Sequence, residues 1–369
     1  MRPLFSEFPE LVGGIAHQEI ASLPTHVEPL PIGKNSWIKR DDLSHPVYGG
    51  NKLRKLEFVI ADAIARGSRR IVTFGAIGTN HGVATAMICR QVGLKCRIYL
   101  FDQPVTSVVC QNLKLMSALG AELRYCGSLA RTVLAFYANP DRAKRESYFL
   151  FAGGSSPLGT LGFVNAAFEL RQQIAENQLP QPKRIVCPVG SGATLAGLSL
   201  GMSMAGLPIE VVGIRVAPSH LGPLPTCTRE TELKLMLQTQ RLLRKYGRST
   251  FGQQQAMPIL LDDYFGNGYG HETDQARDAA SQFEKIGIRL ESTYTAKAAA
   301  AFFAIQATTD EPTLFWNTFN SRDMSELSSQ ADLARFFKTY YSTSALSEHL
   351  EERCKEQYSE RENLRSHDG

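Results

Sequence analysis

Residues 185–201 have the sequence IVCPVGSGATLAGLSLG, an apolar run followed by small residues and a second apolar stretch. The pattern predicts a strand, a tight turn and the N-terminus of a helix. Backbone N–H groups of a turn at Gly190–Thr194 would converge at the positive end of the helix dipole, and Ser191 and Thr194 add hydroxyl groups. We therefore expect a monophosphate to bind at this turn, although a strand-to-helix connection without a ligand would explain the same residues.

Two nucleotide-binding motifs are excluded at this turn. No Gly-Lys-Ser/Thr follows it, as a P-loop would require. The next glycine, Gly197, comes too late for the Gly-x-Gly-x-x-Gly dinucleotide fingerprint.

Short β-rich runs alternate along the chain with longer helical patterns. We expect strands at 70–74, 96–101, 122–126, 148–151, 185–189, 210–216, 258–261 and 313–316, and helices at 53–66, 82–92, 107–119 and 158–178. The alternation predicts an α/β fold with open, twisted, mostly parallel sheets flanked by helices. Two sheets are expected rather than one, because the turn at 190 and a lysine at position 52 fall in different halves and have to meet in a cleft.

That lysine lies in residues 49–55, GGNKLRK, where Lys52 follows two glycines and an asparagine at an expected helix start. Flexible backbone before a helix N-terminus lets an amine lie beside a bound anion. Burial, or a neighbouring cation such as Arg54 or Lys55, would favour the neutral amine, which can form a Schiff base with an aldehyde. Taken alone, a turn followed by a charged helix explains the same stretch.

Six blocks in this order resemble the D-cysteine desulfhydrase and 1-aminocyclopropane-1-carboxylate deaminase family. They are residues 49–57, 75–81, 153–159, 190–198, 262–270 and 294–298. The resemblance implies a tryptophan-synthase-β-like fold (fold type II), pyridoxal 5'-phosphate as the cofactor, a small amino acid as the substrate and a homodimer. It also implies a large domain of residues 1–54 and 161–320, with a small domain of residues 55–160 inserted in it. Residues 321–369 are expected to form a charged C-terminal extension.

The resemblance also implies roles for individual residues. The predicted catalytic residues are Lys52, Tyr294, Tyr269 and Thr79; the cofactor-binding residues are Lys52, Lys55, Asn80, Gly190, Ser191, Gly192, Ala193, Thr194, Tyr294 and Thr318; the substrate-binding residues are Thr79, Asn80, His81, Tyr269 and Thr295. Either phenol could act as the acid. Alternative interpretations are a core aromatic for Tyr294, an ordinary helix residue for His81 and a surface lysine for Lys55.

Two threonines bear on the substrate. Desulfhydrase-type members of the family carry Thr at the positions of Thr295 and Thr318, where deaminase-type members carry Glu and Leu. A hydroxyl beside the ring nitrogen gives a milder electron sink than a carboxylate, which suits β-elimination. The family's Thr-Gly-Gly is Thr318-Phe319-Asn320 here, so two side chains stand where the backbone has to approach closely or take positive φ. That departure argues against taking D-cysteine as the substrate without a test.

We therefore expect a pyridoxal-phosphate-dependent lyase, similar to D-cysteine desulfhydrase, that forms pyruvate, ammonia and sulfide. One alternative is 1-aminocyclopropane-1-carboxylate deamination or other chemistry with the same cofactor. A second alternative is a non-catalytic protein that binds pyridoxal phosphate, for which the change at Phe319 and Asn320 is the only support.

Composition excludes several other classes. A net charge of +4 over 369 residues is too small to indicate a nucleic-acid partner. No run reaches the roughly 20 apolar residues that a membrane span needs, and residues 1–10 lack an apolar signal core. The seven cysteines include no Cys-x-x-Cys pair, so no metal site is expected. We expect a cytoplasmic protein without a membrane partner.

Overall fold

The computed structural model describes residues 1–247, 257–329 and 331. They fall into two compact units: unit 1 comprises Met1–Ala65 and Gly153–Arg322, and unit 2 comprises Arg66–Ala152 and the described residues that follow Arg322. The predicted domain boundaries, at 54/55 and 160/161, fall inside the helices α2 (Lys52–Ala65) and α6 (Pro157–Ala175). The domain assignment therefore stays a prediction. Most of the predicted C-terminal extension lies outside the described residues.

The sheet of unit 1 has six strands in the order β1-β2-β12-β7-β8-β11. All neighbouring strands are parallel except β1 and β2. The strands are β1 (Val27–Pro29), β2 (Ser36–Lys39), β7 (Arg184–Val189), β8 (Glu210–Arg215), β11 (Ile259–Leu261) and β12 (Thr313–Trp316). In the central strand β12, Leu314 stands opposite Trp37 of β2 and Ile185 of β7.

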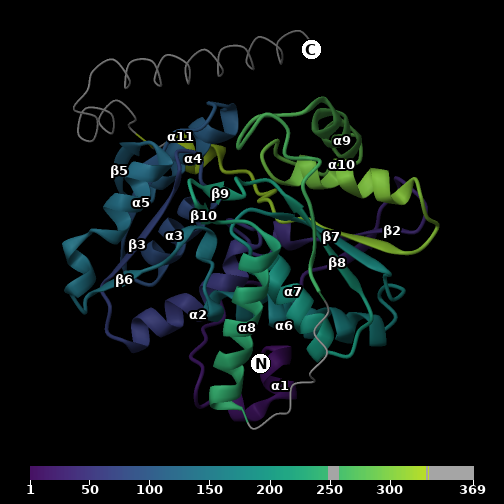
Figure 1. The fold of residues 1–369 in the computed structure, drawn as a ribbon, viewed down its shortest axis with the longest axis horizontal. Coiled ribbons are helices and arrows are strands. Elements are labelled where there is room, and N and C mark those ends of the chain that lie inside the picture. The colour runs from purple at the N-terminus through teal and green to yellow at the C-terminus, as the bar shows by residue number, and fades with distance from the viewer. Residues whose placement is uncertain (248–256, 330, 332–369) are drawn as a thin grey trace. The chain divides into compact units, whose positions relative to one another are not determined.

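Helices cover both faces of this sheet (Figure 1), since α6 and α7 (Ala193–Met204) lie on one side and α9 (Asp274–Glu284) and α10 (Thr295–Gln306) on the other. Side chains alternate along β12 because successive residues of a strand point to opposite faces. Leu314 and Trp316 pack into the core with α6 and α7, whereas Phe315 packs against α9 and α10. All four residues of β12 are buried, as expected for a central parallel strand.

A further layer of helices packs on α6 and α7. The helices α1 (Pro3–Glu7), α2 and α8 (Arg229–Tyr246) share an apolar cluster with them that contains Phe5, Phe58, Phe168 and Met236. The remaining short elements are η1 (Pro9–Leu11), η2 (Asp41–Leu43), η4 (Ala152–Gly154), β9 (His220–Leu221) and β10 (Leu224–Pro225).

Unit 2 has a four-stranded parallel sheet in the order β5-β4-β3-β6. Its elements are β3 (Arg70–Ala76), α3 (Asn80–Gln91), β4 (Lys95–Phe101), α4 (Ser107–Ala118), β5 (Glu122–Gly127), α5 (Leu129–Tyr137), η3 (Pro140–Ala143), β6 (Ser147–Phe149) and α11 (Ser325–Ser329). Phe74 of β3 packs against Phe136 of α5. Every predicted strand and helix is present, and the predicted α/β class with two mostly parallel sheets is confirmed.

Two absences concern the described part of the chain alone. None of its helices is both long and apolar enough to pass through a membrane. It also contains no group of three or more His, Cys, Asp or Glu side chains arranged to hold a metal ion.

A buried ion network fixes the first turn of α2 to the sheet of unit 1. Arg54 donates to both carboxylate oxygens of Asp41, at 2.7 and 2.8 Å, and to both of Glu169, at 2.8 and 2.9 Å. Lys39 of β2 donates to Glu169 Oε1 at 2.6 Å. Burial alone would raise the pKa of Glu169, but the charges of Arg54 and Lys39 outweigh it and hold that pKa well below its usual range.

Replacing Glu169 with glutamine is expected to lower the free energy of unfolding by about 3–5 kcal/mol, because two buried cations lose their shared carboxylate. Glu7→Gln is the matched control. The Glu7 and Arg171 side chains are 40% and 33% exposed, and such surface pairs contribute about 0–1 kcal/mol. Urea unfolding at pH 7 measures both variants; equal losses would contradict the importance of the network.

Candidate active site

Lys52 is the first residue of α2 and lies at the edge of a small polar cluster in unit 1. Its Nζ donates to Asn51 Oδ1 at 2.8 Å and lies 5.9 Å from the centre of the Tyr294 ring. Burial lowers the pKa of Lys52 to about 8, against the opposing charge of Glu291. Roughly a tenth of such amines are neutral at pH 7, so the amine is poised to act as a nucleophile.

The predicted phosphate turn connects β7 to α7, as expected from the sequence. Gly192 stands at the N-cap of α7 with a φ of +91°, a conformation that favours glycine. Asn51 Nδ2 donates to Thr194 Oγ1 at 3.1 Å, so the Asn51 side chain connects Lys52 to the turn. Both lie in unit 1, so the idea that they come from different halves was wrong.

Residues 153–155 also pack against the phosphate turn. Ser155 Oγ donates to Ser191 Oγ at 2.7 Å and accepts from the Ala193 N–H at 3.3 Å. Lys55 Nζ donates to the Gly153 carbonyl at 3.2 Å. Lys55 is only 2% exposed, and burial, together with the charge of Lys52, holds its pKa well below the usual value. The alternative interpretation of Lys55 as a surface lysine is therefore wrong.

Tyr294 and Tyr269 are brought together beside this cluster. Their hydroxyl groups lie 2.6 Å apart and their rings meet edge to face, with centres 5.9 Å apart. Burial raises the pKa of Tyr269 to about 12 and that of Tyr294 well above its usual value. Both phenols therefore keep their protons at neutral pH, and one hydroxyl group of the pair is the donor to the other.

The sequence interpretation missed Glu291, which fixes the position of Tyr294. Its buried carboxylate accepts the backbone N–H groups of Thr293, Tyr294 and Thr295 at 2.6–3.0 Å. Thr295 in turn accepts the Glu291 N–H on its hydroxyl group, at 2.9 Å, so the two residues cap α10. An acidic residue a few positions before the alanine-rich run at 296–301 is the signal that could have identified it. The role of Thr295 in substrate binding stays a prediction.

Residues 318–320 follow β12 and lie against the glycines that precede Lys52. The Thr318 carbonyl accepts the Asn51 N–H at 3.2 Å, and Asn320 Oδ1 accepts the Gly49 N–H at 2.7 Å. Among the described residues, the non-glycine positions with positive φ are Asn35 and Asn177. Phe319 and Asn320 therefore occupy the place of two glycines without backbone strain.

The remaining predicted residues belong to unit 2, at the N-terminus of α3. Thr79 is the N-cap, and its hydroxyl group accepts the Gly82 N–H at 3.1 Å. Asn80 Oδ1 accepts from Asn112 Nδ2 at 2.8 Å. His81 is buried, with Nε2 at 3.0 Å from the Thr73 hydroxyl group. These hydrogen bonds stabilise the first turn of α3. The predicted roles of Thr79, Asn80 and His81 in binding a substrate carboxylate stay predictions.

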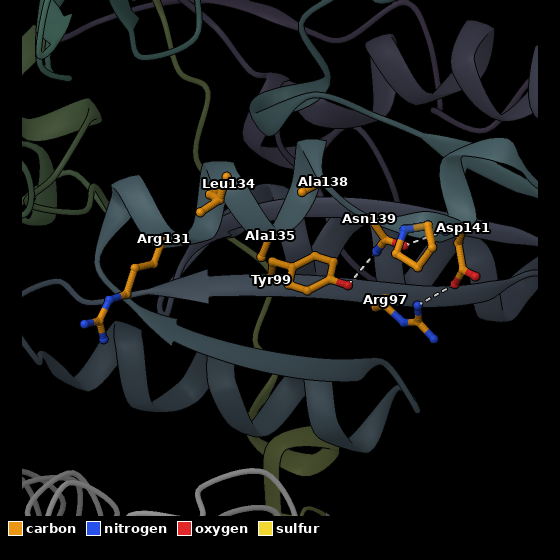
Figure 2. A pocket seen from close by; sticks show the side chains of 9 residues that line it. Arg97, Tyr99, Arg131, Leu134, Ala135, Ala138, Asn139 and Asp141 are labelled. Atoms are coloured by element: carbon orange, nitrogen blue, oxygen red, sulfur yellow. Dashed lines mark hydrogen bonds and ion pairs between the residues drawn. The ribbon is translucent and has the colours of Figure 1, made fainter.

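Unit 2 also has a pocket of its own between β4, α5 and η3 (Figure 2). Four of its polar side chains bind one another in pairs: Asn139 Nδ2 donates to the Tyr99 hydroxyl group at 2.6 Å, and Arg97 donates to Asp141 at 2.8 Å. None of the predicted site residues lines this pocket.

The cluster in unit 1 fits pyridoxal phosphate in its chemistry. Lys52 offers a primary amine for the aldehyde, the N-terminus of α7 offers the positive end of its dipole for the phosphate, and Lys55 Nζ offers a hydrogen-bond donor. Gly190 leaves room that a side chain would fill, because a Cβ there would stand 3.0 Å from Cε1 of Tyr294. The residues that would hold the cofactor in unit 1 are Lys52, Lys55, Gly190, Ser191, Gly192, Ala193, Thr194, Tyr294 and Thr318.

Comparison with known proteins agrees with this chemistry. Residues 21–317 match the family described as "Pyridoxal-phosphate dependent enzyme". A D-cysteine desulfhydrase of Salmonella choleraesuis is 32% identical over 296 residues, which are 76% of this chain and 86% of that protein. A D-cysteine desulfhydrase of Salmonella paratyphi B is 30% identical over 318 residues, covering 81% and 92%.

Solved structures of enzymes also match the fold of this chain. The structure of an "ACC deaminase homologue" matches with a TM-score of 0.74 and 29% identity, covering 89% of this chain and 99% of that one. A fungal L-serine ammonia-lyase from Rhizomucor miehei shares the fold alone, with a TM-score of 0.58 and 17% identity over 88% and 100%. The expected fold type II is confirmed, and the chain belongs to the family of pyridoxal-phosphate-dependent enzymes.

Proposed function

We propose that this enzyme is a D-cysteine desulfhydrase-like lyase that eliminates the β-substituent of a small D-amino acid. The observation that carries the proposal is the chain of contacts from Lys52 through Asn51 to Thr194, which joins a nucleophilic amine to a phosphate turn. The relatives named D-cysteine desulfhydrase, at 30–32% identity, support the substrate class. With D-cysteine the products would be sulfide, pyruvate and ammonia.

Lys52 has two tasks in this proposal. Its amine, with a pKa of about 8, would hold the cofactor through its aldehyde and, when free again, would accept the proton from the α-carbon of the substrate. Asn51 Oδ1 keeps the Nζ atom in place by accepting its hydrogen bond. When bound, pyridoxal phosphate withdraws electrons from the α-carbon of the amino acid that it carries, which makes that proton acidic.

The tyrosine pair would supply a proton to the leaving group. Because both phenols stay protonated at neutral pH, one can donate to a departing sulfide while its neighbour donates to it in turn. Glu291 positions Tyr294 by binding the backbone at the start of α10. The C–S bond breaks, its electron pair leaves with the sulfur, and the released enamine hydrolyses to pyruvate and ammonia.

The alternative of 1-aminocyclopropane-1-carboxylate deamination has the support of the structurally similar homologue. That substrate has no α-proton, so Lys52 could not begin the reaction in the same way, and a nucleophile or a stronger electron sink would be needed. The non-catalytic alternative loses its only support, because Phe319 and Asn320 fit without strain and Asn320 binds the backbone before Lys52.

The proposal includes a homodimer in the cytoplasm that binds no nucleic acid or membrane. The family resemblance supports the dimer, and the sequence supports the other expectations. Light scattering of the purified protein that gave the mass of a monomer would contradict the dimer, and recovery from a membrane fraction would contradict the location.

Tyr269→Phe and Tyr294→Phe are each expected to lower the turnover of D-cysteine by about 10²-fold, because each breaks the pair that delivers the proton. The loss with β-chloro-D-alanine should be small, since chloride leaves without a proton. Pyruvate release from both substrates, with cofactor content checked by absorbance, measures the effect. Full turnover of D-cysteine by both variants would leave the tyrosines with stacking roles alone.

Pyruvate release from D-cysteine or a β-substituted D-alanine is expected to exceed 2-oxobutanoate release from 1-aminocyclopropane-1-carboxylate. The reason is that β-elimination needs only a stabilised α-carbanion, which a neutral partner such as Thr318 at the ring nitrogen is expected to allow. A steady-state assay against a panel of D- and L-amino acids and the cyclopropane compares the rates. Faster deamination of the cyclopropane would overturn the proposed function.

A further inference from the structure

Glu232 lies against the phosphate turn with one carboxylate oxygen that no group of the described chain satisfies. It is in the first turns of α8 and is 1% exposed. A Cβ on Gly192 would stand 2.4 Å from Glu232 Oε1 and 2.7 Å from Oε2, so the carboxyl group fills the space beside the Gly192 α-carbon. The atom concerned, Oε2, is buried and has no hydrogen-bond partner among the described residues.

The charged and titratable groups that face Glu232 come from three other parts of unit 1. Lys55 of α2 is the only cation among them in the described chain, and no hydrogen bond or ion pair joins it to Glu232. Cys187 of β7 and Cys227, just before α8, are the other two. Burial raises the pKa of both thiols to about 12, so neither changes charge near neutral pH.

Burial also raises the pKa of Glu232 to about 7, although Lys55 opposes the shift. A buried carboxylate beside a dianionic phosphate would repel it, since like charges a few ångströms apart disfavour the charged form. The phosphate monoester carries about −1.5 to −2 charges at pH 7. A protonated carboxyl group at the same place is neutral and gains a hydrogen-bond donor.

We propose that Glu232 couples cofactor binding to protonation: the 190–194 turn holds a phosphate monoester only with the Glu232 carboxyl group protonated. The inference rests on the proposed function in one respect, that the phosphate of the cofactor occupies this turn. Binding then takes up a proton wherever Glu232 is ionised in the free protein. The affinity for pyridoxal phosphate is highest below the pKa of free Glu232 and falls as the pH rises through it.

The test compares the affinity of the cofactor-free enzyme for pyridoxal phosphate at pH 6 and pH 8. Glu232→Gln keeps the shape of the side chain and stays neutral, so it should bind like the wild type at pH 6 and about tenfold more tightly at pH 8. The ratio of the two affinities cancels the titration of the ligand and of Lys52. Glu232→Met should give the same ratio and serves if the glutamine variant folds poorly.

Three controls define the source of the effect. Glu230→Gln changes an exposed carboxylate of the same helix turn. This variant should bind pyridoxal phosphate as tightly as the wild type at both pH values. Pyridoxal, which lacks the phosphate, should bind the wild type and Glu232→Gln alike at both pH values. Inorganic phosphate, as a competitor, should reproduce the pH dependence.

Two results would overturn the inference. The first is a ratio of the wild-type affinity for pyridoxal phosphate to that of Glu232→Gln that does not change with pH. The second is weaker binding by the variant at both pH values. The second result would mean that the ionised carboxylate supports the turn. Failure of the proposed function is separate. If borohydride fixed no pyridoxal phosphate to Lys52 of the wild type, the site assignment itself would fail, whatever the behaviour of Glu232.

Discussion

The structure of unit 1 depends on one buried ion network, in which Arg54 is held by Asp41 and Glu169. These residues come from three separate elements, and Trp316 of β12 also donates to Asp41, at 2.8 Å. A guanidinium group without exposed surface must keep all its partners, because an unpaired buried charge is very costly. Since Lys52 lies two residues before Arg54, the network that fixes the helix also fixes the reactive amine.

The phosphate turn lies beside Lys52 but is positioned by other elements of unit 1. It follows β7, the strand next to β12, and the apolar packing of α7 against α6 sets where the helix begins. Asn51 then connects the two parts with one side chain, donating to Thr194 and accepting from Lys52. The position of the amine relative to the turn is thus a consequence of core packing, and the polar contacts refine it.

Patterns within single segments of the sequence were enough to predict most of the strands and both parts of the site. Apolar runs such as 185–189 and 313–316 identified strands, and the glycines before Lys52 and within 190–192 marked the two parts of the site. The short strands β1 and β2 were missed, because three or four residues give too little alternation. Glu291 and Glu232 were missed as well, since their roles arise from tertiary contacts and burial that no local pattern records.

The central claim is that one pyridoxal phosphate joins Lys52 to the 190–194 turn. The most direct measurement is a crystal structure of the enzyme after borohydride reduction, with peptide mapping of the same material. We predict continuous density from Lys52 Nζ to the cofactor, with the phosphate at the backbone of Gly190–Thr194. A cofactor bonded to another lysine, or a phosphate bound away from this turn, would contradict the account.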